Sequence, residues 1–115
     1  MAASTGDLLQ GTLAMLILKA LYHGRPTHGY GIAEWIEATT DDVLRIEEGS
    51  LYPALRRVED KGWVTSAWGL SENNRRARFY TITRAGRAQL RAEGAVWLRY
   101  AAAVTRVLRA EPALA

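Results

Sequence analysis

Apolar residues recur every three to four positions in four stretches of the chain. This period predicts four helices, over residues 7–22, 28–38, 50–61 and 84–109. Capping residues support these boundaries: Ser50 suits the N-cap of the third helix and Thr83 that of the fourth, while Asp7 caps the first or lies in its first turn. Pro53 then falls in the first turn of the third helix, where its missing N–H costs little, and Gly62 ends that helix.

Past the third helix the pattern changes to a period of two, which predicts strands. Residues 63–68 alternate in this way, and residues 78–83 are rich in aromatic and β-branched side chains, so we expect a hairpin with a polar loop over residues 69–76. A shorter apolar run, Val43–Ile46, predicts a small strand before the third helix. The predicted fold is mainly α with a small β hairpin. Its elements follow the order of a winged helix-turn-helix with a long helix added.

The third helix has two distinct faces. Leu51, Leu55 and Val58 form a stripe that we expect to be buried. The opposite side carries Pro53, Arg56, Arg57 and Asp60, with Tyr52 on the flank. Taken alone, this helix is as consistent with a solvated amphipathic helix as with one that enters a DNA groove.

The distribution of charge favours a polyanionic partner. The net charge is only +3, yet residues 75–109 hold nine arginines and one acidic residue, whereas residues 1–74 hold six basic and ten acidic residues. A basic segment on a nearly neutral protein points most simply to nucleic acid. Arginine outnumbers lysine 13 to 2, which suits bidentate contacts to phosphate and guanine but is equally expected from a GC-rich genome.

In a winged helix, the third helix enters the major groove and the hairpin reaches the DNA backbone or the minor groove. The second helix also presents its N-terminus, which can bind phosphate. The predicted DNA-binding residues are therefore His28, Tyr30, Ser50, Tyr52, Pro53, Arg56, Arg57, Arg75, Arg76 and Arg78. For the hairpin arginines, which we place on a flexible loop, the alternative is an ordinary solvated turn.

The last helix predicts a dimer, because a chain this small has little room to bury its aromatic residues. Together with the broad apolar surface of the first helix, it gives a predicted dimer interface of Leu9, Leu13, Leu16, Leu90, Trp97, Ala101, Val104 and Leu108. Gly94 leaves space one turn before Trp97, so we consider a planar aromatic or cationic ligand near Trp97, Gly94 and Met15. The alternative is that Trp97 only packs in an interface or core.

Several classes of function find no support in the sequence. The chain has no cysteine, no metal-ligand spacing, no phosphate-binding glycine loop and no nucleophile paired with a base, so we expect neither an enzyme nor a bound metal or cofactor. No apolar run is long enough to span a bilayer and no signal peptide is evident, so we expect a cytoplasmic protein.

Several linked motifs lie between about Gly11 and Leu90. The motifs are Gly11-Thr12-Leu13 with Ile17-Leu18, His28-Gly29-Tyr30, Gly49-Ser50-Leu51-Tyr52-Pro53-Ala54-Leu55 with Arg56-Arg57, Gly62, Trp68, and Arg76-Ala77-Arg78-Phe79-Tyr80-Thr81-Ile82-Thr83-Arg84-Ala85-Gly86-Arg87. Together they resemble the PadR family of transcriptional regulators. One departure is Gly31, where the family usually has an acidic residue.

The resemblance implies a homodimeric winged-helix repressor of the compact subgroup, in which the last helix pairs with the partner's first and last helices. It places a DNA-binding domain at residues 1–83, with 1–6 as a loose tail, and a dimerisation helix at 84–115 within the same compact unit. It also implies a tryptophan at the dimer centre that stacks planar compounds, and Trp97 is the matching position.

We therefore expect a regulator that binds a pseudo-palindromic operator in double-stranded DNA, with half-sites about one helical turn apart, and that is released by a small-molecule effector. Two alternatives remain. One is a winged-helix module whose basic hairpin binds an acidic protein, and the other is a DNA-binding regulator that has no effector.

Overall fold

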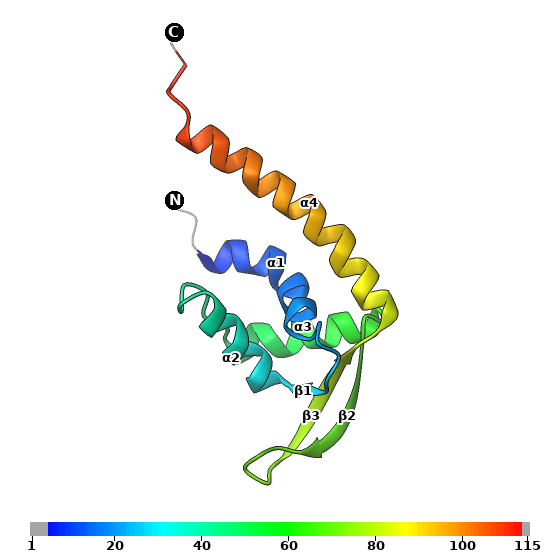
Figure 1. Ribbon diagram of the computed structural model, residues 1–115. Helices are drawn as coiled ribbons and strands as arrows, with labels where there is room; N and C mark the ends of the chain where they lie inside the picture. Colours follow the sequence, from blue (N-terminus) through cyan, green and yellow to red (C-terminus); the bar gives the residue numbers. More distant parts are fainter. Residues whose placement is uncertain (1–4, 114–115) are drawn as a thin grey trace.

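The computed structural model describes residues 5–113 and has the predicted winged-helix architecture (Figure 1). Its helices are α1 (Thr5–Ala20), α2 (Gly29–Thr39), α3 (Glu48–Asp60) and α4 (Arg84–Arg109), and its strands are β1 (Thr27–His28), β2 (Val64–Leu70) and β3 (Arg76–Ile82). The strands form one antiparallel sheet in the order β1-β3-β2. The predicted mainly α fold with a small hairpin is confirmed. Of the predicted loose tail, residues 1–4 lie outside the described residues, and the prediction is wrong for Thr5 and Gly6, which belong to α1.

Helix α1 is the centre of the core and contacts the three other helices. The largest fully buried side chains come from α1, the turn after it, α2, α3 and the base of the hairpin; they are Leu13, Ile17, Leu18, Leu21, Ile32, Ile36, Leu51, Leu55, Val58 and Val64. Burying each of these contributes roughly 1.5–3 kcal/mol of transfer free energy. The predicted buried stripe of α3 is confirmed.

The prediction that Leu13 lies at a dimer interface is wrong. Its side chain is only 1% exposed in the single chain, because it points into the core and not toward the surface of α1. Leu9 is also buried, whereas Leu16 is half-buried and Leu8 is exposed. The surface of α1 that remains open is therefore narrower than its apolar sequence suggests.

The predicted strand at Val43–Ile46 is absent, and this segment forms turns and irregular backbone instead. The chain reverses at Asp41 and Asp42, whose φ angles of 50° and 63° lie in the left-handed region. The backbone N–H groups of Leu44 and Ile46 then donate to the side chains of Thr40 and Glu37, at 3.2 and 2.8 Å. These two backbone N–H groups therefore have hydrogen-bond acceptors without a neighbouring strand. The third strand is β1, at the start of α2.

Helix α3 begins two residues earlier than expected. Its N-cap is Glu47, which makes no side-chain capping bond, so the prediction that Ser50 is the N-cap is wrong. Ser50 lies inside the first turn, and its hydroxyl accepts a hydrogen bond from Gln10 of α1 at 3.2 Å. Pro53 consequently falls past the first turn, inside the helix. Gly62 ends this region with a φ of +78°, as the glycine suggested.

The start of α4 is fastened to the base of the hairpin. Thr83 caps the helix as predicted: its hydroxyl accepts from the N–H of Gly86 at 3.0 Å and donates to the carbonyl of Gly62 at 2.7 Å. A Cβ at Gly86 would collide with the carbonyl oxygen of Trp63, so only glycine permits this close approach.

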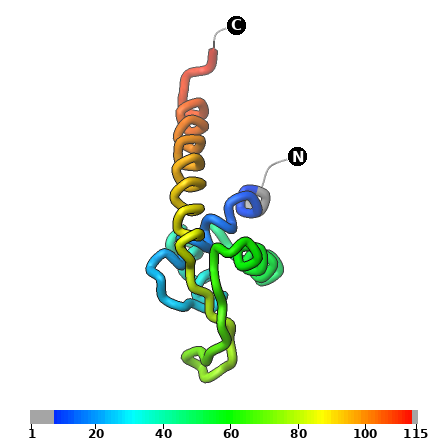
Figure 2. Tube along the Cα trace, turned by 90° about the vertical axis from the view of Figure 1, so that its right-hand side faces the viewer, coloured from blue at the N-terminus to red at the C-terminus, as the bar shows by residue number. Residues whose placement is uncertain are grey.

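Beyond its first turns, α4 leaves the body. The molecule measures 63 × 27 × 22 Å, and Figure 2 shows the C-terminal half of α4 projecting past the other helices. Leu90 is the last α4 residue that is buried in the single chain. The dimerisation helix predicted as part of one compact unit is thus attached only by its first half.

Candidate nucleic-acid interface

The outer face of α3 is polar, aromatic and open to solvent. Pro53, Arg56 and Arg57 are exposed, and the Tyr52 side chain is 48% exposed. The opposite face is buried against α1, which fixes the direction in which these side chains point. The amphipathic helix that the sequence predicted therefore presents two adjacent arginines and an aromatic ring at the surface.

Tyr52 also joins α3 to the start of α2. A Cβ at Gly29 would lie 3.1–3.3 Å from the Tyr52 ring and hydroxyl, so the absence of a side chain lets the ring rest on the first turn of α2. His28 caps that turn, because its Nδ1 accepts from the N–H of Gly31 at 2.9 Å. Tyr30 is 71% exposed beside it. The structure brings together His28, Tyr30 and Tyr52 at one corner.

The glycine at position 31 also has a local explanation. A Cβ there would approach Thr27 at 3.1 Å and the His28 ring at 3.3 Å. The cap itself uses the backbone N–H of Gly31, which any residue except proline would supply. The departure from the family pattern thus changes a local contact and leaves the cap of α2 intact.

The hairpin is longer and more ordered than its sequence suggests. Strand pairing continues to Leu70 opposite Arg76, so that only residues 71–75 form the loop. Within it the Ser71 N–H donates to the Arg75 carbonyl at 2.8 Å, and Asn74 adopts a φ of 58°. Of the three arginines predicted on a flexible loop, only Arg75 belongs to the loop. Arg76 and Arg78 belong to β3.

The two strand arginines stack on one tryptophan. Trp68 of β2 pairs with Arg78 in register, and the guanidinium carbons of Arg76 and Arg78 lie 4.5 and 5.3 Å from its ring centroid. Trp68 remains 57% exposed. Such cation–π contacts contribute about 0.5–1 kcal/mol each at exposed sites. They hold the arginine side chains extended along one face of the hairpin.

Arg78 is further tied to α3 through a polar network. Its Nε donates to the Ser66 hydroxyl at 2.7 Å, that hydroxyl donates to Glu59 Oε2 at 2.6 Å, and Arg78 Nη2 lies 3.8 Å from the same carboxylate oxygen. Glu59 belongs to α3, so the network connects the helix to the hairpin. Arg78 is therefore held by contacts within the protein, whereas the prediction placed it with Arg75 and Arg76 on a flexible loop.

Tyr80 lies beneath this network and stays protonated. Burial raises the pKa of its hydroxyl above the ordinary value of 10.0; Glu59 and Tyr52 add to the rise, and Arg78 and Arg56 oppose it. Residues of α3 and of the hairpin thus act on the same buried group. Helix α3 also contacts β2 directly, so the two candidate contact regions lie side by side.

Sequence reasoning missed Glu59, Ser66 and the role of Trp68. Only the strand register reveals this set, because Ser66, Trp68 and Leu70 face Tyr80, Arg78 and Arg76 across the ladder. The alternation along residues 63–68 was the signal that pointed to one face. The length of the hairpin determines which residues of β2 and β3 pair, and the loop residues alone do not predict that length.

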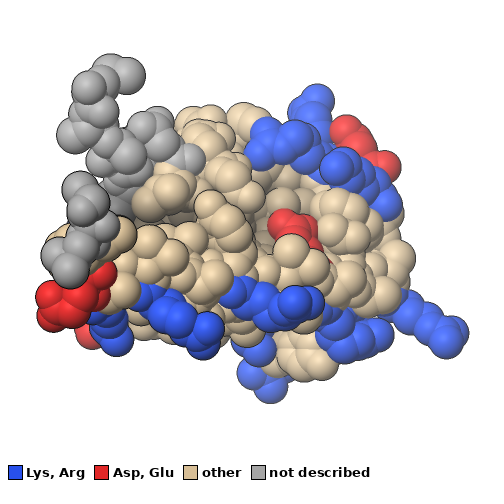
Figure 3. Space-filling view, turned by 90° about the horizontal axis from the view of Figure 1, so that it is seen from above, with Lys and Arg blue, Asp and Glu red and all other residues tan. Residues whose placement is uncertain are grey.

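Arginines also line α4, away from this interface. The exposed ones are Arg84, Arg91, Arg99, Arg106 and Arg109. Neither of the two ion pairs among the described residues involves α4. Figure 3 shows basic side chains along the lower edge of its view, while the middle of that face is largely uncharged.

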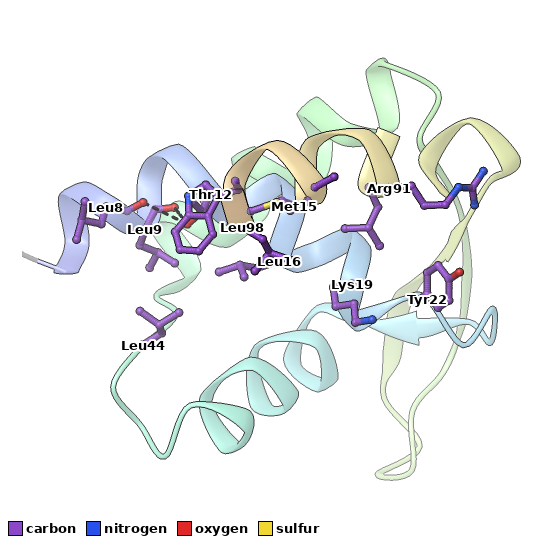
Figure 4. Close-up of a pocket in the computed structure, with 14 residues that line it drawn as sticks. Leu8, Leu9, Thr12, Met15, Leu16, Lys19, Tyr22, Leu44, Arg91 and Leu98 are labelled. Atoms are coloured by element: carbon purple, nitrogen blue, oxygen red, sulfur yellow. Dashed lines mark hydrogen bonds between the residues drawn. The ribbon is translucent and has the colours of Figure 1, made fainter. Parts of the chain in front are cut away.

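An apolar groove of about 760 Å³ runs between α1 and α4 (Figure 4). Its lining includes all three residues predicted to contact a ligand, Met15, Gly94 and Trp97. Nothing lies within 4 Å of a Cβ built on Gly94, which agrees with the space expected beside Trp97. The only charged residues in its lining are Lys19 and Arg91, a feature that the sequence did not suggest.

The other residues predicted at a dimer interface lie on or near this groove. Leu16 and Leu90 line it, and Ala101, Val104 and Leu108 continue the same stripe along the projecting half of α4. Trp97 is 43% and Leu108 79% exposed. The single chain therefore leaves a long apolar surface uncovered.

Two further properties hold for residues 5–113. No helix there is long and apolar enough to cross a membrane. No group of three or more His, Cys, Asp or Glu side chains in that range is placed to hold a metal ion.

Comparison with known proteins identifies similar chains. Residues 17–92 match the model of the transcriptional regulator PadR-like family. A PadR family transcriptional regulator from Eggerthella lenta shares 30% identity, with a TM-score of 0.73 and coverage of 93% of this chain and 90% of that chain. A transcriptional regulator from Clostridium thermocellum shares 29% identity, with a TM-score of 0.76 and coverage of 87% and 96%. An uncharacterized protein from Lysinibacillus sphaericus is 29% identical over 84 residues, which are 73% of this chain and 76% of that protein.

Proposed function

The chain belongs to the PadR-like family of transcriptional regulators, and we propose that it is a homodimeric repressor that reads operator DNA with α3. The observation that carries the proposal is the link between the exposed Tyr52, Arg56 and Arg57 face of α3 and the hairpin through Glu59, Ser66 and Arg78. A helix and a wing held at a fixed separation can contact adjacent grooves of one duplex.

In this proposal the side chains of α3 and of the hairpin have separate roles. Arg56 and Arg57 reach base edges in the major groove, where guanine offers its O6 and N7 acceptors. Arg75 and Arg76 contact phosphates, which fix the position of the protein without reading sequence. Arg78 positions the hairpin through Glu59. Ser50 supports α3 through Gln10, and His28 supports α2 as its cap.

The dimer is proposed to form through the apolar stripe of α4 and the open side of α1. Trp97, Val104 and Leu108 lack cover in the single chain, and a second copy would bury them at about 25 cal/mol per Å² of apolar surface. Two copies related by a two-fold axis present two reading helices, which matches a pseudo-palindromic operator with half-sites about one helical turn apart.

We propose that the groove beside Trp97 takes a planar aromatic effector, and we favour a neutral or anionic compound over a cationic one. Lys19 and Arg91 are the only charged residues in the lining, and both would repel a cation. Binding there would release DNA only if the compound prefers a dimer with a different spacing of the two reading helices.

The test of the proposed function is a binding titration with labelled duplex DNA from upstream of the protein's own gene. We expect tight, salt-sensitive binding by the unaltered chain and a loss of tenfold or more for the double substitution Arg56→Ala, Arg57→Ala. The matched control is Arg25→Ala, Arg45→Ala, which removes the same charge elsewhere and should bind within twofold. Equal losses in both variants would contradict a reading role for α3.

A further inference from the structure

The five exposed arginines of α4 form a regular stripe. At 3.6 residues per turn, Arg84, Arg91, Arg99, Arg106 and Arg109 fall within about 80° of the helix circumference. The other residues in this sector are Ala88, Ala95 and Ala102. We call this set the arginine stripe. The stripe contains no acidic residue, and the residues between its arginines that share this sector are all alanines.

The arginine stripe lies on the side of α4 away from the apolar stripe. Leu90, Trp97 and Leu108 lie roughly 140–160° around the helix from the centre of the arginine stripe. A partner that covers the apolar residues would therefore leave Arg84, Arg99, Arg106 and Arg109 at the surface. Arg91 lies at the edge of the stripe, where it also borders the groove between α1 and α4. Arg87 does not belong to this set, because it is half-buried and stacks on Tyr22 at 4.7 Å.

The proposed reading function does not account for these charges. Figure 1 places the tip of the hairpin and the C-terminal end of α4 at opposite ends of the molecule. A short duplex held by α3 and the hairpin is thus remote from the outer arginines. Neither ion pair among residues 5–113 neutralises them, and like charges three residues apart, as in Arg106 and Arg109, cost about 0.2–0.5 kcal/mol.

We propose that the arginine stripe binds the phosphate backbone of a second duplex DNA segment, so that the regulator holds two segments at once. The stripe is about 38 Å long, close to the length of one turn of duplex. Its first four arginines are about 10–12 Å apart along the axis. The alanines between them let the backbone of a duplex approach the helix, while each guanidinium can bind a phosphate in bidentate fashion.

The arrangement suits DNA better than a lipid surface. A helix that lies on a membrane needs its basic and apolar residues on adjoining faces, because both must meet the bilayer. Here Leu90, Trp97 and Leu108 point away from the arginines. Of the exposed large apolar residues of α4, only Leu98 and Val96 lie within about 100° of the centre of the arginine stripe. Contacts that run only to phosphates bind any sequence, so the second segment needs no operator.

A bridging assay tests the proposal. Duplex DNA from upstream of the gene is fixed to beads, the full chain is added, and retention of a fluorescent duplex of unrelated sequence is measured in 50 mM salt. We expect the unaltered chain to retain the second duplex and Arg99→Gln, Arg106→Gln to retain at least fivefold less. The matched variant Arg25→Gln, Arg45→Gln should retain as much as the unaltered chain.

Each outcome decides the matter. Binding of the fixed duplex without capture of the second would contradict the proposed role of the arginine stripe and would leave the proposed reading function unaffected. Equal losses of second-duplex retention in the two double variants would also contradict this role. So would retention of anionic lipid vesicles but not of DNA, when vesicles replace the second duplex in the same assay. Conversely, stripe-dependent binding of unrelated DNA without a preference for the upstream duplex would support the stripe and reject the reading function. Size-exclusion chromatography checks that both variants keep the same assembly state.

Discussion

The hairpin and α4 carry most of the positive charge of the protein, but they hold it in different ways. On the hairpin, Arg76 and Arg78 stack on Trp68, and Arg78 is bonded through Ser66 to Glu59 of α3. On α4, the arginine stripe lies between alanines with no acidic partner among residues 5–113. Charge that is held in place suits contacts at a defined position, whereas charge on free side chains suits contacts to any polyanion.

The largest effect is expected on the stability of the protein, at Gly86, where α4 meets the base of the hairpin. In Gly86→Ala, the new Cβ would collide with the Trp63 carbonyl oxygen, so α4 and the base of the hairpin must move apart. We expect a loss of about 1–3 kcal/mol in the free energy of unfolding, measured by urea denaturation. Gly94→Ala is the control, because its Cβ would meet nothing within 4 Å. Equal stability of the two variants would contradict the close approach at Gly86.

A large effect on DNA binding is expected from Arg75→Ala, Arg76→Ala. Loss of two phosphate contacts per protomer, and so of four in the proposed dimer, should weaken binding to the upstream duplex about tenfold or more. It should also reduce the slope of log K against log salt by about 3–4. An unchanged slope in a salt titration would count against the hairpin as a phosphate-binding wing.

Glu59→Gln separates a positioning role from a contact role. It removes the carboxylate charge that holds Arg78 while keeping nearly the same shape. If Arg78 only positions the hairpin, affinity should fall about threefold to tenfold with no loss of salt slope. A variant that binds more tightly with a steeper slope would show instead that freed Arg78 contacts phosphate.

Substitutions in the arginine stripe are expected to have the smallest effect, on the affinity for the operator itself. Arg99→Gln, Arg106→Gln should change the affinity for a single short upstream duplex by less than twofold, measured by fluorescence anisotropy at low protein concentration. A tenfold loss would mean that α4 reaches the same duplex as α3, and the contrast between the two regions would disappear.

The sequence predicted the helices and the fold because periodicity records which side of an element is buried. It also predicted the Tyr52, Arg56 and Arg57 face, since the buried stripe of Leu51, Leu55 and Val58 leaves no other orientation. It failed where long-range contacts decide the structure. The short strand β1 forms because Thr27 and His28 pair with Tyr80 and Phe79, and two residues show no period of their own.

The roles of Glu59, Ser66 and Trp68 were missed for the same reason. Their partners depend on the register of β2 against β3, and that register depends on a loop shorter than the polar residues suggested. Ser50 shows the converse error, because a residue that fits the N-cap pattern lies in the first turn of the helix. A local signal was overridden by the packing of α3 on α1.

The central claim, that α3 reads bases in the major groove, is tested most directly by methylation interference at guanine N7 on the upstream duplex. For the unaltered chain we expect two clusters of interfering guanines about one helical turn apart. These clusters should be lost in Arg56→Ala, Arg57→Ala and kept in Arg99→Gln, Arg106→Gln. Interference that survives the α3 substitutions, or that disappears with the α4 substitutions, would contradict the claim.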